Sequence, residues 1–425
     1  MWDAPVHGAF SGGSEVDRNV RWLGFGGVLR ATGLSLILPY FALYLRNVLG
    51  LGFAEIGVLL ALTGVLPLLV VPFAGLLTDR VGRRRVFLLS LAAEGSAVLA
   101  AAYAMELRAL VPLVVAVTGV TLVGTIAQPA ISAYVADFVQ GSDRTRGFTW
   151  LRIGWNVGFT AGVLTGGSLI GLFGFVLVGV AAGAFLLAGT LLVTLELDPS
   201  PYDLARRAQA LPAPTGPRPP SLGESFRIIG RDRPFLALCM AVAISELTIG
   251  QWGVTFPLFV NSVLHIPYAL LGAGLALNGV LVVVLQAPTT QAAIGHRHTS
   301  LFALGTALYA AGFLLLAVFA TVGVAVLLAF FAAVFVLTMG ENVGSIPTTT
   351  LPSNLAPATE IGAYNGAFSA FMGVGQLLAP TVGGVVLAFV GSPLEAWALL
   401  SVPVVPALVM IAGVGRRLPM PANRA

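Results

Sequence analysis

Charge is scarce in this sequence, and so are the residues that form disulfides and metal sites. Only 9% of its 425 residues are charged, whereas a soluble domain carries roughly 25%. Lysine is absent, so all 22 basic residues are arginine, and there are four histidines and one cysteine. A lone cysteine, Cys239, excludes a disulfide or a cysteine-based metal site within the chain. So few charges cannot cover a surface that faces water, and we expect the chain to lie in lipid.

Long hydrophobic runs take the place of charge. Hydrophobic residues make up 57% of the chain, and its mean hydropathy is +0.94. A helix that crosses a bilayer needs about 20 apolar residues, and runs of that kind recur along the whole chain. The pattern predicts an all-α integral membrane protein with twelve transmembrane helices in two pseudo-symmetric six-helix bundles. The expected spans are 20–45, 53–77, 86–104, 110–138, 148–171, 173–195, 235–262, 268–289, 299–318, 321–349, 362–388 and 394–414.

The arginines are distributed unevenly between the predicted loops. If the N-terminus lies inside, the inner loops and tails hold 18 of the 22 arginines, and the outer loops hold Arg46 and Arg108. Inner loops of membrane proteins carry such an excess of positive charge. The sequence therefore predicts a multi-pass protein of the cell (inner) membrane with both termini in the cytoplasm. Topology also explains the slight basic balance, so we expect no nucleic-acid partner.

One long polar segment divides the chain. Residues 198–232, "DPSPYDLARRAQALPAPTGPRPPSLGESFRIIGRD", are rich in proline and charge and lie between the sixth and seventh expected spans. Such a composition is typical of a loop. We interpret it as a cytoplasmic linker between an N-terminal six-helix bundle, residues 1–197, and a C-terminal six-helix bundle, residues 233–425.

Internal repetition supports the division. "GFTAGVLTGG" at Gly158–Gly167 and "GQLLAPTVGG" at Gly375–Gly384 share one spacing of small residues, 217 positions apart. A second pair of patterns, around Gly82 and around Gly295, is offset by 213 positions. Two unrelated patterns with nearly the same offset indicate a duplicated six-span unit. Duplicated bundles are typical of secondary transporters that bind substrate between their halves.

The segment "GLLTDRVGRRRVF", residues 75–87, interrupts the apolar sequence after the second expected span. It resembles the signature loop of the major facilitator superfamily, G-x-L-x-D-R-x-G-R-R/K, which lies between the second and third spans of that family. The matching residues are Gly75, Leu77, Asp79, Arg80, Gly82, Arg83 and Arg84. The resemblance implies a twelve-span fold with two matching halves and a transport function without a cofactor.

The resemblance also implies a conformational latch. In the family, the carboxylate corresponding to Asp79 meets the N-terminus of the eleventh helix, and the arginine corresponding to Arg83 meets an acidic residue that ends the fourth helix, here Asp137. A helix N-terminus attracts a carboxylate, and a contact that forms and breaks suits alternating access. The expected latch residues are Gly75, Asp79, Arg80, Gly82, Arg83 and Asp137. The alternative for the arginines is a loop that only sets topology.

The two glycine-rich segments resemble the antiporter motif g-x-x-x-G-P-x-x-G-G. The chain departs from this motif at Val163, in place of the proline, and at Ala379, in place of a glycine. Close packing of helices through small residues is the alternative interpretation.

Ionisable residues inside a membrane are functional candidates because they are costly to bury. Glu246 is expected near the middle of the seventh span and Glu341 in the tenth. Removal from water favours the protonated form of a carboxyl group, so both residues are candidates for proton coupling. The arrangement resembles twelve-span drug/proton antiporters with carboxylates on these two spans. A structural pair or a hydrogen bond to a neighbouring helix is the alternative.

Arg30, in the first span, is the third candidate for proton coupling, with structural pairing as its alternative. Proton antiporters of the superfamily often carry an arginine in the fourth span, but this chain has none there. Either Arg30 takes that role or the protein is not such an antiporter. Glu94 and Arg152 are the remaining charges within spans, and we expect Glu94 to be mainly structural.

Polar and aromatic residues on the spans that line the cavity of this superfamily, together with one residue of the fifth span, are candidates for substrate binding. They are Tyr40, Tyr44, Gln128, Asn156, Gln251, Trp252 and Asn342. Aromatic rings and acids suit a hydrophobic or cationic guest. Amides and arginine suit a polar metabolite.

The sequence therefore predicts a monomeric secondary transporter whose partners are a small-molecule substrate, protons and the lipid bilayer. The predicted activity is proton-coupled efflux of hydrophobic or cationic small molecules. The alternative is proton-coupled transport of a specific metabolite such as a sugar or an organic acid. The sequence contains no phosphate-binding loop and no nucleophile–base pair that would indicate an ATPase or another enzyme, and no metal site is expected.

Overall fold

The computed structural model describes residues 18–138, 143–208, 222–357 and 360–424, which form helices, turns and one isolated antiparallel bridge between Arg297 and Arg424. The first group of helices consists of α1 (Arg18–Ser35), α2 (Phe41–Asn47), α3 (Phe53–Val81), α4 (Arg83–Glu106), α5 (Leu110–Phe138) and α6 (Asp143–Glu196). Two short helices follow, α7 (Pro201–Arg207) and α8 (Leu222–Arg231). The second group consists of α9 (Arg233–Ile249), α10 (Thr255–Leu258), α11 (Tyr268–Ala293), α12 (His298–Val322), α13 (Val326–Leu355), α14 (Ile361–Phe389), α15 (Pro393–Ser401) and α16 (Val404–Arg417).

Eleven segments of the described chain are long and apolar enough to cross a membrane. One of them contains two spans, because α6 has 54 residues and a non-helical backbone at Gly174 (φ 78°, ψ 168°). A straight helix of that length would measure roughly 80 Å, far more than the roughly 30 Å of a hydrocarbon core. Its two arms correspond to the expected spans 148–171 and 173–195, and counting them separately gives twelve. The predicted all-helical membrane fold is confirmed.

The expected boundary between the ninth and tenth spans is wrong by several residues. The expected tenth span began at 321, but α12 continues to Val322. The residue that follows it, Gly323, has a left-handed backbone (φ 73°) and caps the helix. The tenth span begins at Val326 and extends to Leu355. Hydropathy did not mark this turn, because the residues on both sides of it are apolar. The "APTGPRPP" part of the expected linker lies outside the described residues.

The first and seventh spans are both broken at corresponding places. A turn of 3₁₀ helix at Leu38–Tyr40 separates α1 from α2, and another at Gly250–Trp252 separates α9 from α10. Their first residues, Leu38 and Gly250, lie 212 positions apart (250 − 38), close to the offsets of the sequence repeats. Interrupted helices in corresponding positions of two halves are a pointer to the binding region of a transporter.

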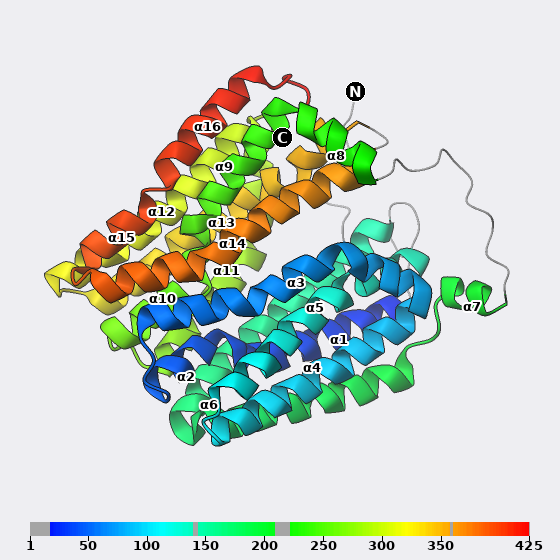
Figure 1. Cartoon of the computed structure of the whole chain (residues 1–425), viewed down its shortest axis with the longest axis horizontal. Coiled ribbons are helices and arrows are strands. Elements are labelled where there is room, and N and C mark those ends of the chain that lie inside the picture. Colours follow the sequence, from blue (N-terminus) through cyan, green and yellow to red (C-terminus); the bar gives the residue numbers. More distant parts are fainter. Residues whose placement is uncertain (1–17, 139–142, 209–221, 358–359, 425) are drawn as a thin grey trace.

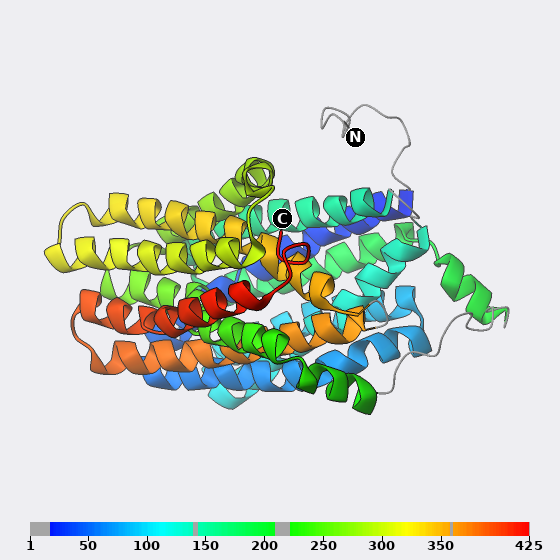
Figure 2. The same ribbon diagram turned by 90° about the horizontal axis from the view of Figure 1, so that it is seen from above.

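The helices form two groups that meet at one end and diverge at the other. Helices α1–α6 lie together, as do α9–α16, and the groups meet where α2 approaches α10 (Figure 1). Contacts between the groups also join α3 to α14 and α6 to α11. The ribbons diverge toward the end that carries α7 and α8, and the long helices run roughly alongside one another when viewed from above (Figure 2).

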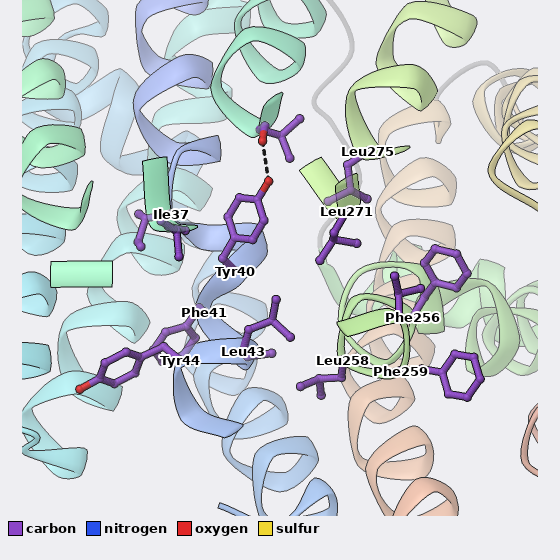
Figure 3. Packing of buried hydrophobic residues seen from close by; sticks show 14 of the residues in the cluster. Ile37, Tyr40, Phe41, Leu43, Tyr44, Phe256, Leu258, Phe259, Leu271 and Leu275 are labelled. Atoms are coloured by element: carbon purple, nitrogen blue, oxygen red, sulfur yellow. Dashed lines mark hydrogen bonds between the residues drawn. The ribbon is translucent and has the colours of Figure 1, made fainter. Parts of the chain in front are cut away.

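The buried cores follow the same division. The largest apolar cluster extends over both groups, with Tyr40 and Leu43 on one side and Phe256 and Leu271 on the other (Figure 3). A second cluster, which includes Phe235, lies within the second group, and a third, which includes Phe87, lies within the first. The shared core therefore lies at the end of α2 and α10, while at the arginine-rich end each group has its own core.

Glycines allow the two groups to approach closely. A Cβ atom at Gly57 of α3 would collide with the backbone carbonyl oxygen of Pro380 on α14, and one at Gly384 would collide with that of Phe53. Small residues at helix crossings allow backbones to pack closely in membranes. The glycine-rich segment Gly375–Gly384 therefore forms part of the contact between the groups.

Candidate functional site

A cavity of about 170 Å³ lies within the second group of helices, and both intramembrane glutamates of that group line it. Glu246 comes from α9 and Glu341 from α13. The hydroxyl-bearing residues of the wall are Thr306, Tyr309, Ser345 and Thr348. None of the residues that line this cavity is an arginine or a histidine. The structure thus brings together the two acids that the sequence analysis placed on different spans.

Glu246 is deeply buried, with 5% of its surface exposed. Its Oε2 atom has no hydrogen-bond partner, and the Gln376 side chain on α14 is its hydrogen-bonding neighbour. A Cβ atom at Gly375 would lie 2.6 Å from the Cβ atom of Glu246, so the glycine brings α14 against this glutamate. A buried oxygen without a partner is costly, and a proton or a water molecule in the cavity would satisfy it.

Glu341 has a more polar environment. The side-chain nitrogen of Asn278 on α11 donates to Glu341 Oε2 over 3.0 Å and to the Thr338 hydroxyl over 2.9 Å. Arg152 on α6 lies close enough to act on Glu341 electrostatically, and it donates a 3.0 Å hydrogen bond to Gln286 on α11. Glu341 is therefore linked to the contact between the two groups of helices through Asn278 and Arg152, and Glu246 through α14, which packs against α3.

Arg30 and Glu94 form a buried ion pair in the first group. Arg30 Nε lies 2.5 Å from Glu94 Oε2, and Arg30 Nη2 lies 2.6 Å from Glu94 Oε1. The two side chains are 7% and 1% exposed, and the guanidinium lies 5.3 Å from the ring centroid of Trp155. Gly124 on α5 leaves room for the pair, because a Cβ there would approach both side chains. This two-pronged geometry neutralises both charges.

Three of the expected substrate residues are buried in this conformation and bonded to backbone groups. Tyr40 donates to the Val163 carbonyl over 2.5 Å, and Tyr44 donates to the Met105 carbonyl over 2.6 Å. The Gln251 amide donates to the Ala379 carbonyl over 2.9 Å. Their roles in substrate binding stay predictions.

The other four expected substrate residues lie in different environments. Gln128 is exposed, and Asn156 is half-buried with its amide bonded to the Arg152 carbonyl over 2.8 Å. Trp252 is half-buried, with its ring 5.0 Å from that of Phe256. Asn342 is fully buried, and neither of its amide atoms has a hydrogen-bond partner. Asn342 is therefore the substrate candidate whose side-chain amide has no hydrogen-bond partner among the described residues and could bind a ligand.

The signature loop forms a sharp turn between α3 and α4. Gly82 has a positive φ of 108° there, a conformation that favours glycine. The guanidinium of Arg83 forms an ion pair with Asp137 at the end of α5, and Arg80 is exposed at the end of α3. Gly75 and Asp79 belong to α3, but their side-chain positions lie outside what the structure describes.

Sequence reasoning did not name the hydroxyl groups of the cavity. Ser345 lies four residues after Glu341, and Thr348 three residues after that, so all three share one face of α13. Thr306 and Tyr309 are likewise three residues apart on α12. Polar residues repeated at helical spacing beside an acid were the signal that could have identified them.

Comparisons with known proteins agree with this architecture. The family model described as Major Facilitator Superfamily matches residues 23–380. The tetracycline resistance protein, class C, of Escherichia coli is 35% identical over 145 residues, which are 33% of this chain, and the chain spans only 35% of that protein. A Na(+), Li(+), K(+)/H(+) antiporter of Planococcus maritimus is 25% identical over 384 residues, which cover 86% of this chain and 87% of that protein.

A crystal structure of the nucleoside transporter NupG superposes with a TM-score of 0.75 at 12% identity, covering 93% of this chain and 100% of that chain. At that identity the likeness shows the fold alone. The family match covers most of the chain, from α1 in the first span to α14 in the eleventh span. The chain therefore belongs to the Major Facilitator Superfamily.

Proposed function

We propose that this protein is a secondary active transporter that exports hydrophobic or cationic small molecules in exchange for protons. The observation that carries the proposal is the shared cavity of Glu246 and Glu341. Its wall holds two acids and no basic side chain, and the nearby Arg152 acts on Glu341 from outside the wall. A proton is therefore the simplest species that can neutralise the acids within the cavity. Access to water from alternate sides of the membrane would then load and release that proton.

The size of the cavity separates proton binding from substrate binding. A volume of about 170 Å³ is below the roughly 300–1,000 Å³ of pockets that hold drug-sized ligands. We therefore assign the cavity to protons and water. The substrate would bind nearer the breaks in the first and seventh spans, where Tyr40, Gln251 and Trp252 lie.

Alternating access is proposed to occur between an N-terminal bundle (1–197) and a C-terminal bundle (233–425), joined by the linker 198–232. If the arginine-rich end and both termini face the cytoplasm, the shared core and the contact of α2 with α10 close the outer side. The structure would then correspond to an inward-facing state of a monomer in the inner membrane. In the opposite state, Asp79 would latch the inner side by meeting the N-terminus of α14, next to the Arg83–Asp137 pair, which is already formed here within the first group.

The names of two relatives support export by exchange. One is a tetracycline resistance protein, and the other is an antiporter of Na⁺, Li⁺ and K⁺ against H⁺. Tetracycline resistance by a membrane protein of this family fits removal of a drug from the cell. The antiporter relative matches nearly the whole chain, so proton exchange fits both halves of the fold.

One observation favours a second candidate, proton-coupled transport of a specific polar metabolite such as a sugar or an organic acid. Asn342 presents a buried amide whose two polar atoms have no partner. A hydroxyl or carboxylate of a metabolite would satisfy both a donor and an acceptor there. A purely hydrophobic guest would leave them unsatisfied.

Transport by purified protein in proteoliposomes tests the proposal. An imposed pH gradient should drive uptake of a fluorescent lipophilic cation into proteoliposomes that carry the protein in the inside-out orientation. Radiolabelled sugars are the comparison substrates. Glu246→Gln and Glu341→Gln should abolish the dependence on the gradient, because the amide cannot ionise. Glu106→Gln, which changes an exposed acid at the far end of α4, is the matched control and should behave as wild type. Equal rates with and without the gradient in the wild-type protein would contradict proton coupling.

A further inference from the structure

A carboxylate on α7 caps the helix that follows the signature loop. Asp203 Oδ1 accepts a hydrogen bond from the backbone N–H of Arg83 over 2.9 Å, and Oδ2 accepts one from Arg84 over 3.0 Å. These are the first two residues of α4, whose own N-cap residue, Gly82, has no side chain to offer. The first N–H groups of a helix have no acceptor within the helix and carry partial positive charge. Asp203 supplies both an acceptor and the complementary charge.

The neighbours of Asp203 hold the same loop. The guanidinium of Arg83, which is paired with Asp137, lies 4.0 Å from the ring centroid of Tyr202. Arg84 donates to the carbonyls of Leu197 over 2.7 Å and Thr194 over 2.8 Å at the end of α6. Asp203 is only 7% exposed. The end of α6 and the following helix α7 together hold Arg83 and Arg84 in place.

The second half of the chain contains a matching arrangement at its C-terminal end. Asn423 Oδ1 accepts from the backbone N–H of Thr299 over 3.0 Å, and the Asn423 carbonyl accepts from the N–H of His298 over 2.8 Å. Asn423 Nδ2 also donates to the Thr299 hydroxyl over 3.0 Å. His298 and Thr299 begin α12, and its N-cap residue, Arg297, provides no side-chain cap. Asn423 is fully buried.

The two arrangements correspond in detail. In each half, the capped helix is the third span, and it follows a turn at a glycine with positive φ, 108° at Gly82 and 82° at Gly295. The capping residue comes shortly after the sixth span of its half, since α6 ends at Glu196 and α16 at Arg417. The side-chain caps join residues 120 and 124 positions apart in the chain. Chance would not place both acceptors at equivalent positions, so the caps belong to the duplicated unit.

We propose that Asp203 and Asn423 are matched positioning residues for the transport cycle. Each ties the start of the third span to the segment after the sixth, so that each half keeps its inner end rigid while the halves move. Asp203 has the further task of orienting Arg83 toward Asp137 from a helix that lies on the connection between the halves. The inference rests on the proposed alternating-access function for its kinetic consequence, but the caps themselves are independent of any substrate.

Hydrogen–deuterium exchange of the purified protein tests the caps directly. In Asp203→Ala, exchange at the amides of Arg83 and Arg84 should rise by roughly tenfold, the fold-change that corresponds to about 1.4 kcal/mol of lost capping energy. Exchange around Thr299 should stay unchanged. Asn423→Ala should give the reverse pattern. Asn423→Asp should restore protection, because aspartate caps a helix as well as asparagine does. Met420→Ala, at a half-exposed position on the same tail, is the control.

Transport kinetics test the positioning role. Asp203→Ala should lower the turnover number several-fold and leave KM unchanged, because the change affects the conformational step and no substrate contact. Asp203→Asn, which retains one acceptor oxygen, should give an intermediate loss, and it serves as the test variant if the alanine variant fails to fold. Unchanged exchange at Arg83 and Arg84 in either variant would overturn the caps. Increased exchange with an unchanged turnover number would overturn the positioning role. A wild-type protein without proton-driven transport would reject the proposed function and leave the exchange result standing.

Discussion

The Tyr40 hydroxyl donates a hydrogen bond to the backbone carbonyl of Val163, over 2.5 Å, across the break in the first span (Figure 3). The seventh span has a counterpart, because Gln251 at its break donates to the Ala379 carbonyl over 2.9 Å. Val163 and Ala379 both lie in the glycine-rich segments that the sequence repeats. In each half, a polar side chain at the broken helix therefore binds the glycine-rich helix beside it.

Removal of the Tyr40 hydroxyl tests the importance of this bond. Tyr40→Phe keeps the ring in the shared core and deletes one hydrogen bond, so we expect a loss of about 1 kcal/mol of stability. Thermal unfolding in detergent measures it. Tyr103→Phe is the matched control, because Tyr103 is 66% exposed and its hydroxyl should contribute nothing. A loss of stability in Tyr40→Phe that is no larger than the loss in the control would show that the bond does not stabilise the fold.

Crowding the contact between α3 and α14 should impair the conformational change. A methyl group at Gly57 would collide with the Pro380 carbonyl, and overpacking of this kind costs about 1–3 kcal/mol. Gly57→Ala should therefore lower the transport rate several-fold and reduce the population with α3 against α14. Gly27→Ala is the control, because a Cβ at Gly27 would meet nothing within 4 Å. Equal rates in the two variants would mean that this close approach is not needed.

Asn47 should control opening at the end where α2 meets α10. Its side-chain nitrogen donates across the two groups of helices to Asn261 Oδ1 over 2.8 Å and to the Tyr268 hydroxyl over 2.7 Å. At about 0.5–1.5 kcal/mol for each bond, Asn47→Ala should shift the equilibrium toward the open form. Modification of Ala269→Cys, which lies in the adjacent cavity, by a thiol reagent in a Cys239→Ser background should then be faster. An unchanged rate would exclude Asn47 from gating.

Variants of the Arg30–Glu94 pair distinguish a structural role of the pair from a role in proton coupling. Arg30→Met alone should destabilise the protein by about 3–5 kcal/mol, because it leaves Glu94 charged and buried. The double variant Arg30→Met/Glu94→Leu should recover most of that loss in thermal unfolding. If the double variant still couples transport to a pH gradient, the pair is structural. If it unfolds as readily as the single variant, the pairing argument is wrong.

The positions of the spans were predictable because a hydrocarbon core demands long apolar helices, whatever their neighbours. The rotation of each helix about its own axis was not predictable, because a helix with apolar residues on every side has no distinct hydrophobic face to assign to the protein interior. Sequence reasoning therefore found Arg30 and Glu94 on separate spans but could not predict that they pair. It named Glu246 and Glu341 but could not predict that they share one cavity.

The helix caps escaped sequence reasoning for a different reason. Asp203 lies in a segment interpreted as a linker, and Asn423 is followed in the given sequence only by Arg424 and Ala425. Each meets its partner about 120 residues away in the chain. A local pattern cannot predict such a contact, because capping usually involves residues within one turn of each other.

Proton release on substrate binding tests the central claim most directly. Purified protein in weakly buffered detergent solution should release protons when a transported lipophilic cation is added, and a pH-sensitive dye would record them. The double variant Glu246→Gln/Glu341→Gln should bind the same cation and release none, because no carboxyl group remains among the residues that line the cavity. Proton release of equal size from the wild type and from the double variant would contradict the account.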